Sequence, residues 1–162
     1  MRKLTFGEIS HDIIKKEKYL SLKTEYHHGL TRYMHSLRVA KYTYIITKFL
    51  KLNYIEATRA ALLHDYFNEL EYLDKVWLDK PRIHPFLSLN NASHEYKLTL
   101  LEKNIIISHM FPIGGIKPEY LESWIVTIID KSVATYEYIN FKFKDSFTLQ
   151  FIFLFNFLSF KL

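Results

Sequence analysis

Apolar residues recur along most of the chain at intervals of three and four, which is the spacing of an amphipathic helix. Polar capping residues, Gly and Pro divide this pattern into segments. The predicted helices cover residues 10–22, 31–50, 55–67, 85–94, 99–109 and 118–140. No segment alternates strictly enough to predict a convincing strand, so we expect an all-α bundle.

Local residues suggest where several of these helices begin and which one is central. Ser10 is expected to cap the first helix, Pro85 to open the fourth, and Thr99 with Glu102 to form a capping box. Residues 57–63 are small or apolar on nearly every face, which predicts that the third helix is buried. In the second helix, the apolar positions with helical spacing are Met34, Leu37, Tyr42, Ile45, Ile46 and Phe49.

The C-terminal end differs from the rest. Residues 147–160 carry no charge and are rich in Phe, but they are fewer than the ~20 that cross a bilayer as a helix. We therefore separate a helical domain, residues 1–145, from an apolar segment, residues 146–162. This segment either packs on the core as a helix or strand, forms a homo-oligomer interface or membrane-surface contact, or is a non-native tail produced by a truncated or shifted reading frame.

Composition narrows the classes of protein. The length of 162 residues suits one domain, and the absence of Cys excludes disulfides, thiolate metal sites and Cys nucleophiles. The N-terminus lacks the apolar core of a signal peptide, so we expect a cytoplasmic protein. A net charge of +5 allows anionic partners, but the 22 basic and 17 acidic residues are spread along the chain. Nucleic-acid and membrane partners are therefore not expected.

Two acidic residues lie in unusually apolar surroundings. Asp65 follows His64 at the end of the most apolar helix, where an ionised carboxylate is expensive to bury unless a partner such as a metal ion neutralises it. On a helix, Asp130 has only apolar or small neighbours three and four residues away, so we expect a metal or a basic side chain opposite it. Imidazole and carboxylate ligands suit Fe, Mn, Co, Ni or Zn.

The order of these residues resembles the HD superfamily of metal-dependent phosphohydrolases. The matching motifs are His35-Ser36-Leu37-Arg38-Val39-Ala40, Ala60-Ala61-Leu62-Leu63-His64-Asp65 and Ile128-Ile129-Asp130-Lys131. The resemblance covers residues 27–140. It implies a single-domain orthogonal bundle of five to seven helices in which His35, His64, Asp65 and Asp130 bind a divalent transition metal.

Two further histidines resemble those of a two-metal branch of the superfamily. His84 precedes a Pro, and His109 follows three isoleucines and a serine. The resemblance is to small bacterial proteins, including enzymes that split symmetrical dinucleoside tetraphosphates. It implies a second ion, with Asp65 bridging the two. Met110 stands where some relatives have another His, so the likeness to cyclic-dinucleotide phosphodiesterases is incomplete.

The resemblance implies hydrolysis of a phosphoester or phosphoanhydride bond in a nucleotide or small phosphorylated metabolite, by metal-activated water. Asp65 and Lys131 are the expected catalytic residues. A non-catalytic nucleotide-binding sensor is the alternative. Glu69 has the place of a water-activating acid in related nucleotidases, although a solvent-facing role is favoured. Candidates for contacting substrate phosphate are Arg38, Arg32 and His28.

Overall fold

The computed structural model of the chain describes residues 3–27, 30–72 and 79–159, with the side chains of residues 26–27, 30, 72 and 144–159 outside the description. The elements are α1 (Phe6–Ile14), α2 (Glu17–Ser21), β1 (Tyr26–His27), β2 (Leu30–Thr31), α3 (Arg32–Phe49), α4 (Tyr54–Leu63), the 3-10 helix η1 (Glu69–Tyr72), α5 (Lys80–Glu95), α6 (Leu100–Ser108) and α7 (Leu121–Ser159). Apart from the two-residue antiparallel pair β1–β2, the regular elements of the described chain are helical, which confirms the all-α prediction.

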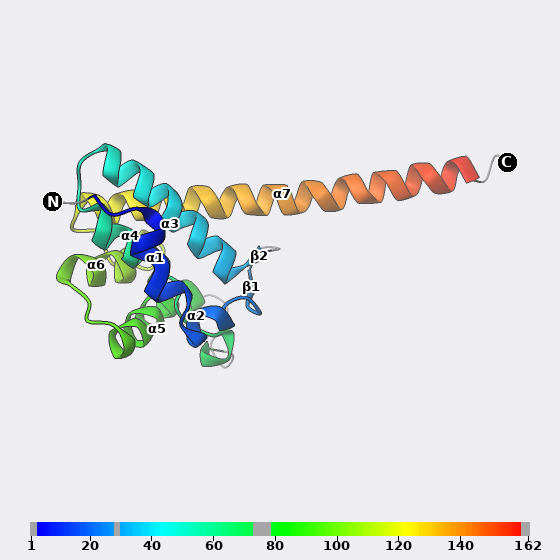
Figure 1. Cartoon of the computed structure of the whole chain (residues 1–162). Coiled ribbons are helices and arrows are strands. Elements are labelled where there is room, and N and C mark those ends of the chain that lie inside the picture. Colours follow the sequence, from blue (N-terminus) through cyan, green and yellow to red (C-terminus); the bar gives the residue numbers. More distant parts are fainter. Residues whose placement is uncertain (1–2, 28–29, 73–78, 160–162) are drawn as a thin grey trace.

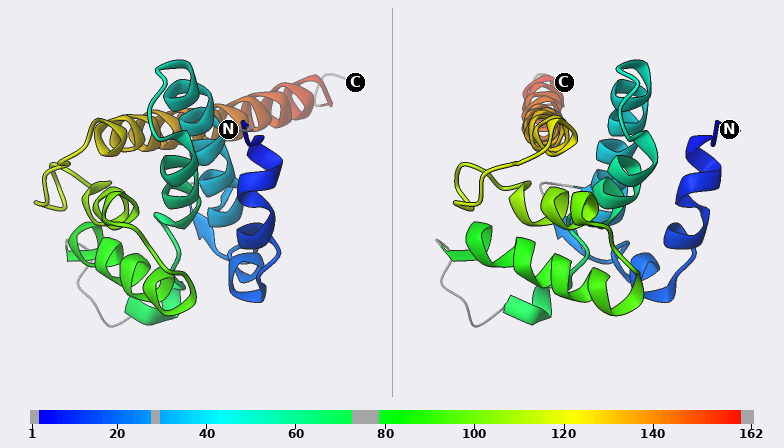
Figure 2. Two further views of the ribbon diagram at one scale, coloured as in Figure 1. Left: turned by 60° about the vertical axis from the view of Figure 1, so that its left-hand side comes forward. Right: turned by 90° about the vertical axis from the view of Figure 1, so that its left-hand side faces the viewer.

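The helices are arranged around α4 (Figure 1). This helix contacts α1, α3, α5, α6 and α7. The view almost along α7 shows α1 and α7 on opposite sides of the α3–α4 pair (Figure 2). Because α4 touches elements from both ends of the chain, its C-terminal end brings together side chains that are far apart in sequence.

The composition of α4 explains its central place. Ala57, Ala60 and Ala61 have no exposed surface, and neither have Leu62 and Leu63. Small side chains let neighbouring helices approach closely, since the distance between packed helices depends on the residues at the contact. The prediction that this helix is buried is confirmed.

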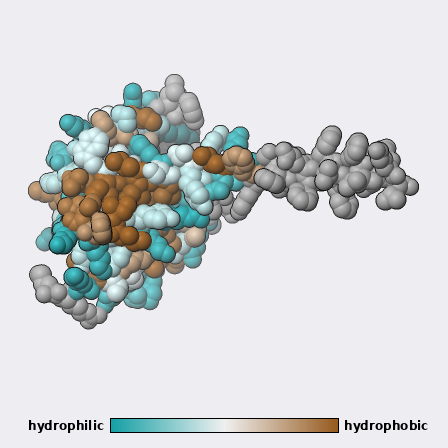
Figure 3. Space-filling view, turned by 90° about the horizontal axis from the view of Figure 1, so that it is seen from above, coloured by the Kyte–Doolittle hydropathy of each residue, from teal (hydrophilic) through white to brown (hydrophobic). Residues whose placement is uncertain are grey.

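The buried face of α3 is not the one that its apolar residues suggest. The face that packs inward is small or polar and includes His35, Ser36 and Val39, whereas Phe49 is 83% exposed and Tyr42 51% exposed. The tight contact with α4 favours small side chains there. Apolar side chains instead gather on the outer side formed by α3 and α7 (Figure 3). A groove of about 490 Å³ on this side is lined by Arg38, Tyr42, Ile46, Ile128, Ile129, Ser132, Val133 and Tyr136.

The first predicted helix is wrong in its start and its continuity. The helix begins at Phe6, where Thr5 and Glu8 form a capping box, and Ser10 lies buried inside it. Ser10 has Ile13 three residues later, so it cannot form the reciprocal bond that Thr5 makes. The backbone then becomes extended at Lys16, which separates α1 from α2.

Other helix limits differ in a similar way. Helix α5 corresponds to the predicted helix over residues 85–94. It starts at Lys80, with a proline in its first turn, so Pro85 lies inside it rather than at its start. The central helix ends at Leu63, and His64 is its C-cap. The capping box of Thr99 and Glu102 is present as predicted.

The last helix is longer than predicted. It extends to Ser159 and leaves the bundle (Figure 1) instead of ending near residue 140. The side chains of residues 144–162 lie outside the description, so the oligomer and membrane-surface contacts of this segment remain predictions.

No helix in the described part of the chain is both long enough and apolar enough to span a membrane.

We expect Glu102→Ala to lower the free energy of unfolding by about 2–3 kcal/mol, because it removes a charge-assisted bond and half of a capping box. Glu102 is 1% exposed, and its Oε1 accepts a 2.6 Å hydrogen bond from Arg59 Nε. The matched variant Glu8→Ala opens the exposed capping box of α1 and should cost about 1 kcal/mol or less. Urea denaturation measures both values. Equal losses would show that the buried ion pair adds nothing.

Candidate metal centre

The end of α4 places His64 and Asp65 in the interior. His64 has no exposed surface and Asp65 is 8% exposed. His64 Nδ1 lies 2.7 Å from the carbonyl oxygen of Ala61, one of the carbonyls that a helix end leaves without a partner. A carbonyl oxygen only accepts, so Nδ1 carries the proton. Nε2 is therefore the nitrogen of His64 that is available to a metal.

His109 and His84 are oriented in the same way. His109 is the C-cap of α6, and its Nδ1 donates to the carbonyl oxygen of Ile106 at 2.7 Å. His84 lies in α5 and its Nδ1 donates to the carbonyl oxygen of Lys80 at 3.0 Å. Three imidazoles from three helices thus have Nδ1 occupied by their own backbone, and each has Nε2 free for another partner.

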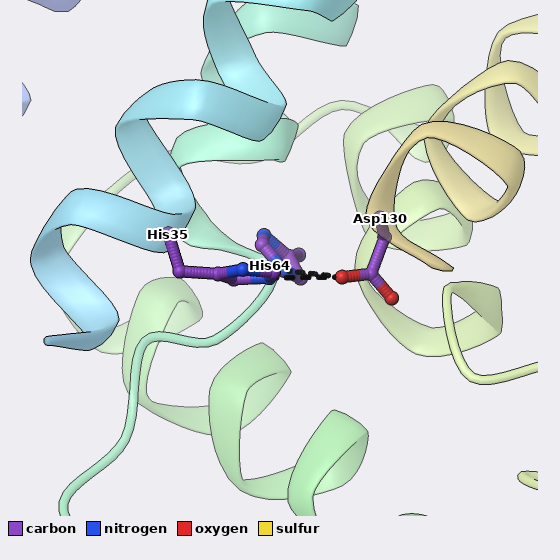
Figure 4. A group of neighbouring side chains, drawn as sticks. All are labelled: His35, His64 and Asp130. Carbon is purple, nitrogen blue, oxygen red and sulfur yellow. Dashed lines mark hydrogen bonds and ion pairs between the residues drawn. The ribbon is translucent and has the colours of Figure 1, made fainter. Parts of the chain in front are cut away.

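His35, His64 and Asp130 form a group that could hold a metal ion, here called the first ligand set. Both imidazoles point toward the carboxylate, His35 from α3 and His64 from the end of α4 (Figure 4). His35 Nε2 lies 2.9 Å from Asp130 Oδ1, and His64 Nε2 lies 3.4 Å from the same oxygen. All three residues are buried, and their donor atoms lie within 4.8 Å of one another.

Asp65, His84 and His109 form a second candidate group, here called the second ligand set. Asp65 Oδ1 lies 3.4 Å from His84 Nε2 and 3.6 Å from His109 Nε2. Its other oxygen, Oδ2, lies 3.7 Å from His64 Nε2. The donor atoms of His64, Asp65 and His109 also lie within 4.8 Å of one another. The two oxygens of Asp65 therefore face different ligand sets.

The residues present fit divalent metal ions. Among the described side chains, His64 Nε2 and Asp65 Oδ1 are buried atoms without a hydrogen-bond partner, a costly state. The Nε2 atoms of His84 and His109 lie 2.9 Å apart, although both Nδ1 atoms already donate to carbonyls. Two neutral rings would direct lone pairs at each other there. A cation that both nitrogens bind removes this conflict, and imidazole and carboxylate are common transition-metal ligands.

Burial and neighbouring charges shift the pKa values of the first ligand set. Burial opposes a charged His35, but hydrogen bonds with Asp130 and Glu137 raise its pKa to about 10. Burial likewise opposes a charged His64, and Asp65 and Asp130 raise its pKa above the usual value. The Asp130 carboxyl has its pKa lowered by hydrogen bonds with both histidines, which outweigh its burial. Without a metal, the first ligand set is therefore a buried cluster of protonated imidazole and carboxylate groups.

In the second ligand set the pKa of the histidine His84 is lowered, whereas the pKa values of the histidines in the first set are raised. Burial lowers the pKa of His84 to about 4, despite the nearby Asp65 carboxylate. Burial also opposes a charged Asp65, yet the histidines around it, His64 above all, hold its pKa well below the usual value. Asp65 is therefore a carboxylate at neutral pH, and His84 is a neutral imidazole ready to bind a cation.

Lys131 lies beside the cluster. Its ammonium group donates a 2.8 Å hydrogen bond to the carbonyl oxygen of His109 and lies 3.9 Å from Asp130 Oδ2. Its side chain is 37% exposed. Burial lowers the pKa of Lys131, whereas Asp130 acts in the opposite direction. Lys131 thus contacts the backbone of His109 and remains accessible to solvent.

The structure separates the proposed phosphate-binding residues. Arg32 is 2% exposed, and its guanidinium lies over the Phe67 ring and 3.4 Å from a Glu25 oxygen. Its charge is therefore already paired inside the fold, and its contact with substrate phosphate stays a prediction. Arg38 is partly exposed and binds Glu137. His28 lies outside the described residues, and Glu69 faces solvent, as favoured.

Glu137 is the site residue that the sequence patterns missed. It is 3% exposed, and its Oε2 lies 2.8 Å from His35 Nδ1. Glu137 follows Asp130 by seven residues, which is close to two turns, so both project from one face of α7. The signal that could have found Glu137 is a second acid seven residues after Asp130. Only the residues three and four positions from Asp130 entered the sequence-based prediction, so it did not include Glu137.

A His-Asp dipeptide alone does not make such a site. His11 and Asp12 lie side by side on α1, with side chains 56% and 92% exposed. Their contact joins only the two neighbours, His11 Nδ1 and Asp12 Oδ1 at 3.0 Å. Burial at a helix end that faces other helices distinguishes His64 and Asp65 from this pair.

Comparison with known families places all six donors inside one match. A family model described as HD domain matches residues 32–135, more than half of the chain. Comparisons with curated proteins and with solved structures found no match.

Metal binding should release protons at neutral pH. His35 must lose a proton to offer Nε2, because its metal-free pKa is about 10, while His84, with a pKa of about 4, is already neutral. Metal affinity should therefore rise with pH through the neutral range. Calorimetric titration in buffers of different ionisation enthalpy counts the protons. His35→Gln should release about one fewer per chain. Heats that do not depend on the buffer would contradict this prediction.

Proposed function

The chain belongs to the HD domain family, and we propose that it is a metal-dependent phosphohydrolase. It would cleave a phosphoester or phosphoanhydride bond of a nucleotide or small phosphorylated metabolite. One observation carries the proposal: four imidazoles and two carboxylates from five helical segments converge in the interior, with the Nε2 atoms of three histidines directed there because backbone carbonyls occupy their Nδ1 atoms.

The residues that would hold metal are the two ligand sets. Nitrogen and oxygen donors favour Fe, Mn, Co, Ni or Zn. Such ions, when bound, neutralise phosphoryl charge and lower the pKa of the attacking water. The chain itself contributes fixed ligand orientation and a largely buried site, which strengthens every charge interaction inside it. No side-chain nucleophile is needed, consistent with the absence of Cys.

We further propose that the centre takes two ions, with Asp65 as the bridging ligand. Its Oδ2 faces the set that contains His64, and its Oδ1 faces His84 and His109. This division supports a site of the kind that acts on dinucleoside polyphosphates, which are therefore among the substrates to test. A cytoplasmic location remains a prediction.

Lys131 is proposed to contact the substrate phosphate. It is a cation next to the cluster that retains access to solvent, and its hydrogen bond to the His109 carbonyl keeps it at the edge of the second ligand set. A positive charge there would offset charge that develops on phosphoryl oxygens.

Hydrolysis of phosphate esters tests the proposed activity. Protein loaded with each of the five metals is assayed with nucleotides, dinucleoside tetraphosphates and p-nitrophenyl phosphate. We expect turnover of at least one substrate, reduced at least about a hundredfold in Asp65→Ala because the shared ligand is lost. The matched variant Asp12→Ala alters the exposed His-Asp dipeptide and should keep full activity.

The same assay separates the alternatives. Equal activity in Asp65→Ala and the unchanged protein would contradict the proposal. Tight nucleotide binding without turnover under every metal would favour the non-catalytic sensor.

Counting bound metal tests the two-ion site. Elemental analysis should find about two ions per chain, and about one in His84→Ala, because the second ligand set loses a donor. His94→Ala is the matched control, since His94 lies exposed on the same helix and should leave the count unchanged. A count of one in the unchanged protein would restrict the site to the first ligand set with Asp65.

A further inference from the structure

We propose that Glu137 is a positioning residue for the metal centre: it holds the His35 ring with Nε2 directed at the first ligand set, and Arg38 holds Glu137 in turn. The inference rests on the metal site of the proposed function, but it does not depend on the reaction. Nothing in the family match reaches Glu137, because the match ends at residue 135.

The contacts form one continuous hydrogen-bond network between α3 and α7. Glu137 Oε2 lies 2.8 Å from His35 Nδ1, and Glu137 Oε1 accepts a 2.9 Å hydrogen bond from Arg38 Nη1. On the other side of the ring, His35 Nε2 lies 2.9 Å from Asp130 Oδ1. Both carboxylate oxygens of Glu137 are therefore used, and the acid is 3% exposed.

Glu137 is the hydrogen-bond acceptor for His35 Nδ1, the role that backbone carbonyls have for the other three histidines. The Nδ1 atoms of His64, His84 and His109 donate to carbonyls of their own helices. For His35 the acceptor is a side chain from another helix. A carboxylate only accepts, so both nitrogens of the metal-free ring donate, Nδ1 to Glu137 and Nε2 to Asp130. When a metal displaces the proton on Nε2, Glu137 keeps the proton on Nδ1. Acceptors of this kind orient ligating histidines and make their free nitrogen a better ligand.

The position of Arg38 fits this role. It follows His35 by three residues and so lies on the same side of α3. Its guanidinium pairs with a carboxylate that would otherwise be buried beside one imidazole alone. The side chain is 36% exposed, so a change at Arg38 disturbs the interior less than a change at Glu137.

A purely structural role is the competing explanation, because the same contacts also connect α3 to α7. The two roles differ in what they change. A structural pair alters the stability of the metal-free protein and leaves metal affinity alone. A positioning residue alters metal affinity and the preferred protonated nitrogen of His35, even where the fold is intact.

The experiment measures metal affinity by competition with a chelator, using Zn²⁺ or Mn²⁺ alone and no substrate. Glu137→Gln should weaken binding about 10–100-fold, the range for partners of metal-bound histidines. The matched control is Glu119→Gln, the same change at an exposed glutamate. Arg38→Gln should weaken binding in the same direction but less, and Arg38→Lys should retain more affinity than Arg38→Gln. Nitrogen NMR of the metal-loaded protein should show His35 protonated at Nδ1, and a mixture in Glu137→Gln.

The outcomes separate this inference from the proposed function. Unchanged metal affinity in Glu137→Gln, with only its unfolding temperature lowered, would overturn the inference while leaving hydrolysis possible. Weakened affinity in a protein that hydrolyses nothing would support the inference and count against the proposed activity. If Glu137→Gln does not fold, Arg38→Gln decides. A higher KM with unchanged metal affinity in that variant would assign Arg38 to the substrate and contradict its link to Glu137.

Discussion

The occupation of Nδ1 in each of four histidines, three of them buried, is the constraint on which this centre depends. A buried imidazole has two nitrogens to satisfy, and a partner for one decides what the other can do. In His64 and His109 the partner is a carbonyl that the end of a helix leaves free. Once Nδ1 donates there, Nε2 is the nitrogen left to bind a cation. The interior then directs Nε2 atoms and carboxylates at one another, an arrangement that positive charge stabilises, whether protons or a metal ion supply it.

Helix ends suit this purpose because they combine burial with unpaired carbonyls. His64 and His109 each follow directly after the last residue of a helix, so each ring meets its acceptor three residues back without bending the chain. The small residues of α4 let α3 and α7 come close, which brings His35 and Asp130 within reach of the same end. The inner face of α3 is occupied by His35 and small residues, so the larger apolar side chains of this helix lie on its outer face.

Sequence patterns predicted the fold class, the burial of the helix that is α4 and the capping box of α6, because each depends on residues close together in the chain. The start of α1 was wrong because two capping candidates compete and only Thr5 has a glutamate at the right spacing. The pair His64-Asp65 and the pair His11-Asp12 look alike in sequence, and only tertiary burial distinguishes them. The surroundings of Arg32 were not predictable for a similar reason: nothing local shows that its charge pairs with Glu25 and lies over a ring.

Glu137 shows why second partners of ligands are harder to find than ligands. A metal ligand stands out as a polar residue in apolar surroundings, whereas a second partner needs only to meet the ligand from another helix. The long helix α7 makes this meeting specific, because Asp130 and Glu137 lie about two turns apart and contact opposite nitrogens of one ring. The separation between them is therefore set by the helix and not by side-chain flexibility. A shift of α7 along α3 would remove both contacts together, so the packing of these two helices and the orientation of His35 are one property of the fold.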